Sequence, residues 1–282
     1  MSELRDFWER EGYIAVSDVF DKARTENLLR ICDDVLAQFL DCCPERKKPG
    51  GVDDRNMRNL HRRSYFKDKP DDFVFMMEAF ADPALSDIVE EILGKKIILR
   101  GTTYWFTPTN MNIAGNWHRD IQFLGKDPEE QKVYVESQEA QSGAQLMLAL
   151  TPTDCSQYLP GSHLRWDTDE ELHMRLGDDC IHATQDLEGA VRVKQEPGDV
   201  TILNATGLHR GDYFNDVLRR TVMITYTTEE EPIDDYFSLA PWCLEPGYLD
   251  GMNDYTKAFY QRYIDQYTDF WNSKTRKNGW DT

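Results

Sequence analysis

The spacing of hydrophobic and polar residues predicts helices in the first third of the chain. Apolar residues recur at three- and four-residue intervals over Asp21 to Leu40 and again over Asp72 to Leu93, where Pro83 interrupts the pattern. A short helical piece is expected near residues 6–8, and the segment GYIAV that follows Gly12 predicts a strand. Residues 1–96 are therefore expected to be mostly helical.

From Ile97 the pattern changes to short apolar or alternating runs separated by turn signals. The runs are IILRGTTYWF, IQFL, AQLMLAL, AVRVK, DVTILN and RTVMITY. Such runs are typical of an antiparallel sandwich or barrel rather than of alternating strands and helices. From Asp254 the helical period returns, with aromatic residues that we expect to pack on the barrel or on a second subunit.

No repeat or linker divides the chain, so we expect a single domain over residues 1–282. Residues 97–228 would form the β core, and residues 229–282 a helical tail. Hydrophobic residues make up 40% of the 282 residues and charged residues 29%, a balance typical of globular proteins. No apolar run reaches the roughly 20 residues of a membrane helix, and the charged start MSELRDFWEREGY does not resemble a signal peptide. We therefore expect a cytoplasmic protein that does not bind membranes.

The charge and the cysteines narrow the expected partners. The six cysteines show no CxxC spacing, so reduced thiols are expected rather than disulfides or a zinc knuckle. A formal charge of −19 would repel phosphate backbones, which argues against nucleic-acid binding. One basic island interrupts the acidic chain, because residues 45–69 hold nine Lys or Arg against four acids.

The motif Asn116-Trp117-His118-Arg119-Asp120 is a candidate half of a metal site. On a strand, His118 and Asp120 would point to the same side, while Arg119 would point elsewhere. They would supply two of the three ligands of a site with two histidines and one carboxylate, the arrangement that holds Fe(II) in non-haem oxygenases. By itself this motif is weak evidence for a metal site, because a histidine and an aspartate that form a hydrogen-bonded pair on the surface would show the same spacing.

The third ligand has two candidates, His163 and His209. His173 and His182 lie in a charged stretch, and His61 belongs to the basic island. His209 follows a Pro-Gly-Asp turn and a short apolar strand, a position from which a side chain can reach the mouth of a barrel. His163 follows a Pro-Gly-Ser turn, where a hydrogen-bonded loop histidine is the favoured interpretation.

Two arginines, Arg219 and Arg220, begin the apolar run TVMITY. A buried guanidinium without a partner is costly, so at least one of the two should meet an anion. A dicarboxylate cosubstrate could provide it.

These motifs together resemble the phytanoyl-CoA dioxygenase family of Fe(II)/2-oxoglutarate oxygenases. The resemblance rests on the HxD motif, a histidine 91 residues later (209 minus 118), an arginine 11 residues after that, and YLPGSHLRW between them. FWEREGYIAVSDVF and DPALSDIVEEILGKKI are similar to the family's opening and to the helix before its barrel. The segment TPTDCSQYLPGSH departs from the family, because it lacks the Asn-Gly turn often found before PGSH.

The resemblance implies a mainly β fold with added helices, a double-stranded β-helix of the jelly-roll, cupin-like type. It implies that His118, Asp120 and His209 bind Fe(II), and that Arg220, with Arg219 as the alternative, binds the distal carboxylate of 2-oxoglutarate. The implied activity is an O₂-dependent oxidation, with hydroxylation of an aliphatic C–H and release of succinate and CO₂. Asp120, in place of the Gly or Ala that would open a halide position, favours hydroxylation over halogenation.

Two other functions remain open at this stage. The first is a catalytically silent barrel that binds a ligand or partner, and the second is a zinc hydrolase, which the absence of HExxH disfavours. For the enzyme, we expect a small-molecule substrate, and a homodimer stays open as the assembly. The basic island suggests an anionic substrate read by Arg58 or Arg62, helped by Arg119 or Arg210 beside the metal ligands. The alternative is an island of solvated charges that only balance their acidic neighbours.

Overall fold

Two antiparallel β-sheets form the centre of the molecule. The computed structural model describes residues 2–42, 56–66, 68–107, 113–137, 143–177, 184–214 and 216–278. Within these residues, the larger sheet has the strand order β1-β8-β5-β10-β3-β2, and the smaller sheet has the order β4-β9-β6-β7. The strands are β1 (Tyr13–Val16), β2 (Asn56–Arg58), β3 (Ile97–Thr107), β4 (Ile113–Ala114), β5 (Gly143–Ala149), β6 (Thr153–Tyr158), β7 (Val191–Gln195), β8 (Val200–Leu203), β9 (His209–Tyr213) and β10 (Arg219–Thr228).

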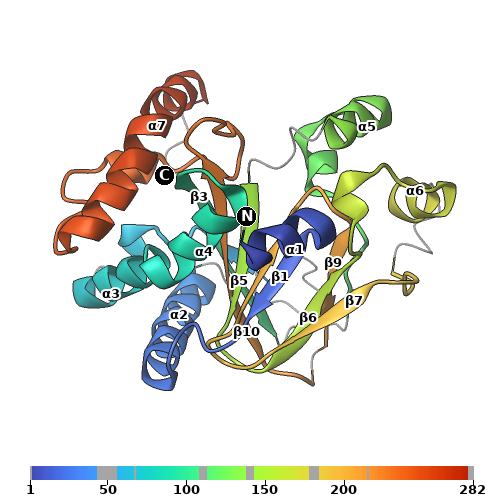
Figure 1. Ribbon diagram of the computed structural model, residues 1–282. Helices are drawn as coiled ribbons and strands as arrows, with labels where there is room; N and C mark the ends of the chain where they lie inside the picture. The colour runs from blue at the N-terminus through green and yellow to red at the C-terminus, as the bar shows by residue number, and fades with distance from the viewer. Residues whose placement is uncertain are drawn as a thin grey trace.

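Helices cover one face of the larger sheet and flank the smaller one. Figure 1 shows α2, α3, α4 and α7 together on one side of the larger sheet, while α5 and α6 lie near the end of the smaller sheet. The helices are α1 (Glu3–Glu11), α2 (Lys22–Cys42), α3 (Pro70–Phe80), α4 (Pro83–Leu93), α5 (Pro128–Glu136), α6 (Asp169–Leu176) and α7 (Asp254–Asn278). Short 3-10 helices are η2 (Arg63–Phe66), η3 (Asp120–Leu124), η5 (Ser162–Leu164) and η6 (Pro241–Leu244).

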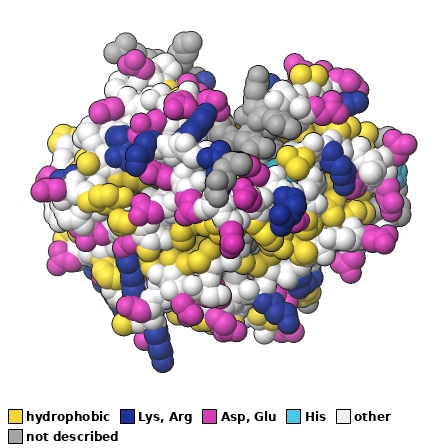
Figure 2. All heavy atoms as spheres, viewed as in Figure 1, with side chains coloured by type: hydrophobic (Ala, Val, Ile, Leu, Met, Phe, Trp, Pro, Cys, Tyr) yellow, Lys and Arg dark blue, Asp and Glu magenta, His cyan; other side chains and the backbone are white. Residues whose placement is uncertain are grey.

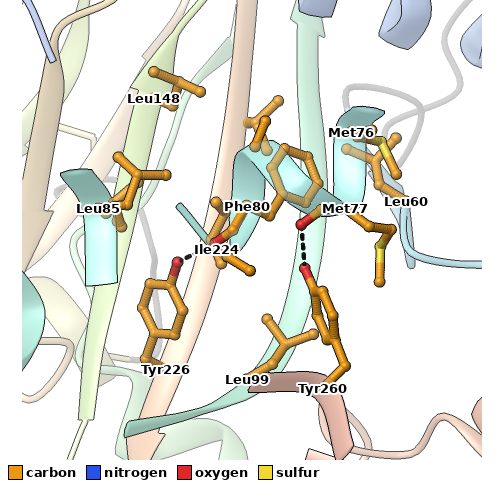
Figure 3. Packing of buried hydrophobic residues seen from close by; sticks show 14 of the residues in the cluster. Leu60, Met76, Met77, Phe80, Leu85, Leu99, Leu148, Ile224, Tyr226 and Tyr260 are labelled. Carbon is orange, nitrogen blue, oxygen red and sulfur yellow. Dashed lines mark hydrogen bonds between the residues drawn. The ribbon is translucent and has the colours of Figure 1, made fainter. Parts of the chain in front are cut away.

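The main hydrophobic core lies between the larger sheet and its helices. Figure 3 shows Phe80 of α3 close to Ile224 of β10, and Leu99 of β3 beside Tyr260 of α7; all four residues are buried. Side chains alternate across a strand, so the neighbours of Ile224 on β10 point away from this core, toward the smaller sheet. The face of the larger sheet that the helices cover therefore belongs to the core. The opposite face is available for a functional site.

The aromatic stripe of the C-terminal helix belongs to this core. Tyr260, Tyr263, Tyr267 and Trp271 are all fully buried within the chain. The Trp271 indole N–H donates to Ser238 O at 2.6 Å, which anchors the helix to the segment after β10. The expected aromatic packing is thus confirmed as packing within one chain.

Most of the predicted elements are present, with one clear exception. The interruption at Pro83 separates α3 from α4, where Asp82 caps the second helix by accepting from Ala84 N at 2.7 Å. The run IQFL was expected to be a strand, and this prediction is wrong: it lies in η3, which ends at Gly125 with φ 73°. The mostly helical first part also contributes both edge strands, β1 and β2, of the larger sheet.

The surface carries mixed charges. Figure 2 shows Asp and Glu side chains spread over the visible face with Lys and Arg among them, and hydrophobic side chains gathered in a band across its middle. In the part of the chain that the structure describes, no helix is both long and apolar enough to cross a membrane. The thiols of Cys32, Cys155 and Cys243 are free and buried.

Two tyrosine hydroxyls that bind the end of α3 provide a matched test of this core. Tyr226 donates to Phe80 O and Tyr260 donates to Met77 O, both at 3.0 Å (Figure 3). Phe80 ends the helix, so its carbonyl oxygen has no partner within α3, whereas Met77 O also accepts from Ala81 N at 3.1 Å.

We expect Tyr226→Phe to lower the free energy of unfolding by about 1–3 kcal/mol, because it leaves a buried acceptor unpaired. Tyr260→Phe should cost about 1 kcal/mol or less, since Met77 O keeps its second donor. Urea unfolding of both variants measures the difference. Equal losses would show that the hydroxyl of Tyr226 is not what satisfies the end of α3.

Candidate metal centre and cosubstrate pocket

An isolated β-bridge brings His118 and His209 together. His118 N donates to His209 O, and His209 N donates to His118 O, both at 3.0 Å. The two residues form a directly opposed antiparallel pair, so their side chains lie on the same side. Their imidazole rings are 4.3 Å apart between centroids.

Asp120 completes the cluster from the first residue of η3. Its backbone N–H donates to Ala205 O at 2.9 Å, which fixes the turn of the chain after His118. The carboxylate Oδ1 lies 3.6 Å from His118 Nε2 and 3.5 Å from His209 Nε2. All three ligand atoms lie within 4.8 Å of one another, a spacing that can hold one metal ion.

The remaining polar atoms of this cluster are held by neighbours. His118 Nδ1 lies 2.7 Å from Asn116 O, and His209 Nδ1 lies 3.0 Å from Gly207 O. A carbonyl oxygen only accepts, so Nδ1 carries the proton in each ring and Nε2 keeps its lone pair for a metal. The second oxygen of Asp120, Oδ2, accepts a short hydrogen bond from Gln145 Nε2 of β5.

The electrostatics of the cluster favour the protonation states that a metal requires. Burial, together with the neighbouring His209, lowers the pKa of His118 to about 4. Burial alone would raise the pKa of Asp120, but the neighbouring imidazoles of His209 and His118 outweigh it and leave this pKa below its ordinary value. At neutral pH the site therefore offers a neutral His118 and a carboxylate.

Arg119, between the two candidate ligands, anchors the motif in the protein. Its guanidinium is fully buried and pairs with the buried carboxylate of Asp167 at 2.7 Å. It also donates to Ser162 O at 2.8 Å. Arg175 of α6 binds the other oxygen of Asp167 at 2.7 Å. These bonds occupy Arg119, so it supports the site from behind and has no group left to read a substrate.

A cavity opens beside Asp120. It contains about 500 Å³ of space between atoms, part of it open to solvent, and its wall includes Asp120, Gln145, Thr225 and Asn204. A smaller adjoining cavity of about 270 Å³ shares Asp120 and Gln145 and adds Tyr236 and Phe237. Both cavities have Asp120 in their walls, so a molecule bound in either would lie beside the candidate metal position.

Arg219 lies on the same side of β10 as Thr225, which lines the cavity. Its side chain is buried, its Nε donates to Thr221 Oγ1 at 3.2 Å, and its Nη1 has no hydrogen-bond partner among the described residues. The guanidinium stacks on Tyr213 at 4.9 Å and on Trp105 at 5.8 Å between its Cζ and the ring centroids. A buried cation with an unpaired donor is costly, so this position fits an anionic ligand.

Arg220 points to the opposite side of the sheet. Its Nε donates to Asp33 of α2 at 2.6 Å, and Nη1 donates to Arg219 O at 3.0 Å and to Thr107 O. The sequence favoured Arg220 for the cosubstrate, but two of its three guanidinium nitrogens are paired within the protein, whereas Nη1 of Arg219 has no partner among the described residues.

Further unpaired polar atoms line the inward face of the larger sheet. Among the described residues, Thr103 Oγ1, Trp105 Nε1, Thr201 Oγ1 and Thr225 Oγ1 are buried without a hydrogen-bond partner. The first two lie on β3 and the others on β8 and β10, and the strand register places them on one face. Buried polar groups are normally satisfied, so this set indicates room for a polar ligand.

The other histidines that the structure describes do not join the cluster. His163 Nε2 lies 3.2 Å from Glu9 O, so it contacts α1, in keeping with a hydrogen-bonded loop histidine. His61 is fully buried beside Thr102, and burial lowers its pKa to about 3. His173 lies in α6. His182 lies outside the described residues.

The candidate substrate arginines separate into two kinds. Arg210 is buried and binds Asp186 and Gln157, so its guanidinium is occupied like that of Arg119. Arg62 stacks on Trp242 of η6 at 5.3 Å and lines neither cavity. Arg58 is exposed and stacks on Tyr236 at 5.0 Å, beside the smaller cavity.

Two residues beside the cluster were missed in the sequence. Gln145 is a single polar residue in the apolar strand AQLMLAL, and this isolation was a usable signal. Arg100 lines both cavities and pairs with Asp235. Its inward direction depends on an irregularity of β3 that the sequence does not reveal.

Comparisons with known proteins agree with this geometry. The family description "Phytanoyl-CoA dioxygenase (PhyH)" matches residues 8–213. No curated protein sequence matches the chain. The fold is similar to EctD from S. alaskensis in its apoform, with a TM-score of 0.60 at 16% identity over 90% of this chain and 85% of that one.

Two further solved structures share the fold. AviO1 from Streptomyces viridochromogenes Tue57 has a TM-score of 0.56 at 17% identity and covers 82% of this chain and 96% of its own. The non-heme alpha ketoglutarate dependent carbocyclase SnoK from nogalamycin biosynthesis has a TM-score of 0.57 at 16% identity, covering 81% and 84%. With the family match over most of its length and the His-Asp-His cluster in place, this chain belongs to the phytanoyl-CoA dioxygenase family of Fe(II)- and 2-oxoglutarate-dependent oxygenases.

Proposed function

We propose that this protein hydroxylates an aliphatic C–H bond of a small molecule, with Fe(II) held by His118, Asp120 and His209 and 2-oxoglutarate held by Arg219. The observation that carries the proposal is the convergence of the three ligand atoms within 4.8 Å, in a molecule whose adjoining sheet face buries an unpaired guanidinium. Two histidines and one carboxylate are the ligand set of non-haem Fe(II) oxygenases.

The choice of Arg219 rests on strand phase. Arg219 shares a side of β10 with Thr221 and Thr225, and Thr225 lines the cavity with Asp120. The unpaired Nη1 of Arg219 and the unpaired Trp105 Nε1 are donors that a carboxylate can accept from. Arg220 points to the other side of the sheet, where its Nε and Nη1 donate to Asp33 and to two carbonyl oxygens, and for this reason we assign the role to Arg219.

The chain's own residues would bind, orient and shield the reactants. Bound Fe(II) and 2-oxoglutarate supply the oxidation, in which 2-oxoglutarate becomes succinate and CO₂ while one oxygen atom of O₂ enters the substrate. His118, Asp120 and His209 would hold the metal. Gln145 holds Asp120 Oδ2, which leaves Oδ1 directed at the two Nε2 atoms. Phe123, whose ring lies 5.5 Å from that of His118 between centroids, lines the smaller cavity beside Asp120.

The metal assignment predicts that His118→Ala, Asp120→Ala and His209→Ala each lose bound iron, because this ligand set has no spare member. We expect metal analysis after dialysis, and succinate release from 2-oxoglutarate, to show the loss in all three variants. His163→Ala is the control, since His163 contacts Glu9 O instead. Loss of iron in the control with iron retained in His209→Ala would contradict the assignment. A barrel that only binds ligands would release no succinate even as the wild type.

Gln145 is a positioning residue for Asp120. Gln145→Leu removes the donor to Oδ2 and frees the carboxylate to rotate, so we expect affinity for Fe(II) or Zn(II) to fall about 10–100-fold. Competition with a chelator measures this affinity without turnover. Gln145→Glu removes the same donor but places a second carboxylate beside Asp120. Its metal affinity should therefore differ from that of Gln145→Leu. An unchanged metal affinity in Gln145→Leu would show that Gln145 does not position Asp120.

Arg219 and Arg220 form a matched pair for cosubstrate binding. We expect Arg219→Gln to raise the concentration of 2-oxoglutarate needed for half-maximal succinate release steeply, in line with a cost of about 2–5 kcal/mol for breaking a buried charge pair. Arg220→Gln should leave this concentration near the wild-type value and should lower stability instead, because it breaks the contact with Asp33. The reverse result would return the role to Arg220.

A further inference from the structure

A β-bulge turns Arg100 toward the cavity. Along the pairing of β3 with β10, Gly101 lies opposite Thr225 and Leu99 lies opposite Tyr226, so Arg100 is an extra residue with no partner of its own. Bulges occur next to active sites, where they redirect a side chain. Arg100 accordingly lines both cavities together with Asp120.

Only part of the Arg100 guanidinium is used. Its Nη2 pairs with Asp235, and both side chains are largely buried, at 12% and 10% exposure. Arg100 Nε has no hydrogen-bond partner among the described residues. Asp235 is itself fixed, since its Oδ1 accepts from Phe237 N at 2.9 Å and from Ser238 N at 3.1 Å. Arg100 is therefore held in place with a donor to spare.

A second arginine stands over the same aromatic wall. The Cζ of Arg58 lies 5.0 Å from the ring centroid of Tyr236 and 5.6 Å from that of Phe237, while Arg100 lies 5.6 Å from Phe237. Arg58 is exposed and forms no ion pair with the described residues. Burial raises the pKa of Tyr236, and the nearby charges of Arg58 and Asp120 act on it in opposite directions. Tyr236 thus lies beside Arg58 and lines the smaller cavity together with Asp120, the candidate iron ligand.

The charges around this wall leave a positive excess. Among the described residues, Arg58 and Arg100 face one carboxylate, that of Asp235, because Asp120 would bind the metal in the proposed function. Charges act strongly only within roughly 8 Å at physiological salt, so the overall charge of −19 does not cancel this local excess. A small anion is therefore favoured here although the protein as a whole repels it.

The rest of the cavity wall suits an apolar body with a hydrogen-bond acceptor. Ile121, Leu124 and Ile233 contribute apolar surface. Asn204 lines the same cavity, is fully buried, and has an Nδ2 without a partner among the described residues. Its Oδ1 accepts from Thr206 N at 3.0 Å, so the amide is oriented with its N–H₂ group free to donate.

We propose that the primary substrate is a small carboxylic acid whose carboxylate binds between Arg58 and Arg100 over Tyr236 and Phe237. Its aliphatic part then lies along Ile121 and Leu124 toward Asp120. This inference rests on the proposed function for the identity of the site, and it deepens that function by naming the substrate class. It also separates Arg58 from Arg62 and Arg63, whose described contacts lie elsewhere.

The test compares acids with their neutral analogues in binding experiments that need no turnover. Hexanoate, octanoate and phenylacetate, each paired with its primary amide, are titrated calorimetrically into protein loaded with Ni(II) and 2-oxoglutarate. The proteins are the wild type, Arg58→Gln, Arg100→Gln and the control Arg62→Gln. Arg62 is an arginine of the same segment that also stacks on aromatic rings but lines neither cavity.

We expect at least one acid to bind the wild type and the control about tenfold more tightly than its amide, and this preference to fall to about threefold or less in Arg58→Gln and Arg100→Gln. Added salt should weaken the wild-type preference. Equal binding of acids and amides, a preference unchanged in both variants, or no binding of any acid at millimolar concentration would overturn the proposal. Arg58 is exposed, so its variant stays informative if Arg100→Gln does not fold.

Wild-type succinate release separates this inference from the function it rests on. A wild type that converts 2-oxoglutarate to succinate but does not prefer acids contradicts the substrate class alone. A wild type that prefers acids but releases no succinate contradicts the proposed oxygenase activity and leaves the anion site standing.

Discussion

The site depends on one pair of reciprocal hydrogen bonds between His118 and His209. Each residue donates its backbone N–H to the carbonyl of the other, so two segments 91 residues apart (209 minus 118) are fixed in register. A slip of one residue would send one imidazole to the other side and leave Asp120 with a single neighbour. The larger sheet then places Gln145 of β5 so that it donates to the second oxygen of Asp120.

The side chains of the three-residue motif His118-Arg119-Asp120 point to two different sides of the chain. The outer residues point to the candidate metal position. The central arginine points into the protein, where its guanidinium pairs with one oxygen of Asp167 while Arg175 pairs with the other. Removing one member of such a buried network leaves an uncompensated charge, which costs more than the network contributes. The arginine therefore explains why a segment with little regular structure holds its ligands in place.

Residue type and spacing indicated the parts of the candidate site that are local in the chain. His118 and Asp120 stood out as a short motif, the resemblance to a family added His209, and the structure brings the three ligand atoms together. The helix break at Pro83 could be predicted because proline acts locally. Strand phase was harder, because Arg219 and Arg220 are identical side chains that point to opposite faces. A signal was present in the residues that follow them. Val222, Ile224 and Tyr226 are core residues, whereas threonine or methionine stands at the positions between them, and Arg219 shares the phase of Thr221. The bulge at Arg100 had no such signal, since it arises from the pairing of two distant strands.

The edge strand β1 gives the molecule an unusual order of assembly. Among the described residues, Tyr13–Val16 pairs with Val200–Leu203 of β8 alone, so this strand is synthesised well before its partner. About 190 residues separate the partners, which at roughly 5–20 residues per second is a delay of about 10–40 s during synthesis. Through that interval the segment is an unpaired edge of the kind that invites wrong partners. Its shortness, four residues, limits the edge that it offers to a wrong partner during this interval.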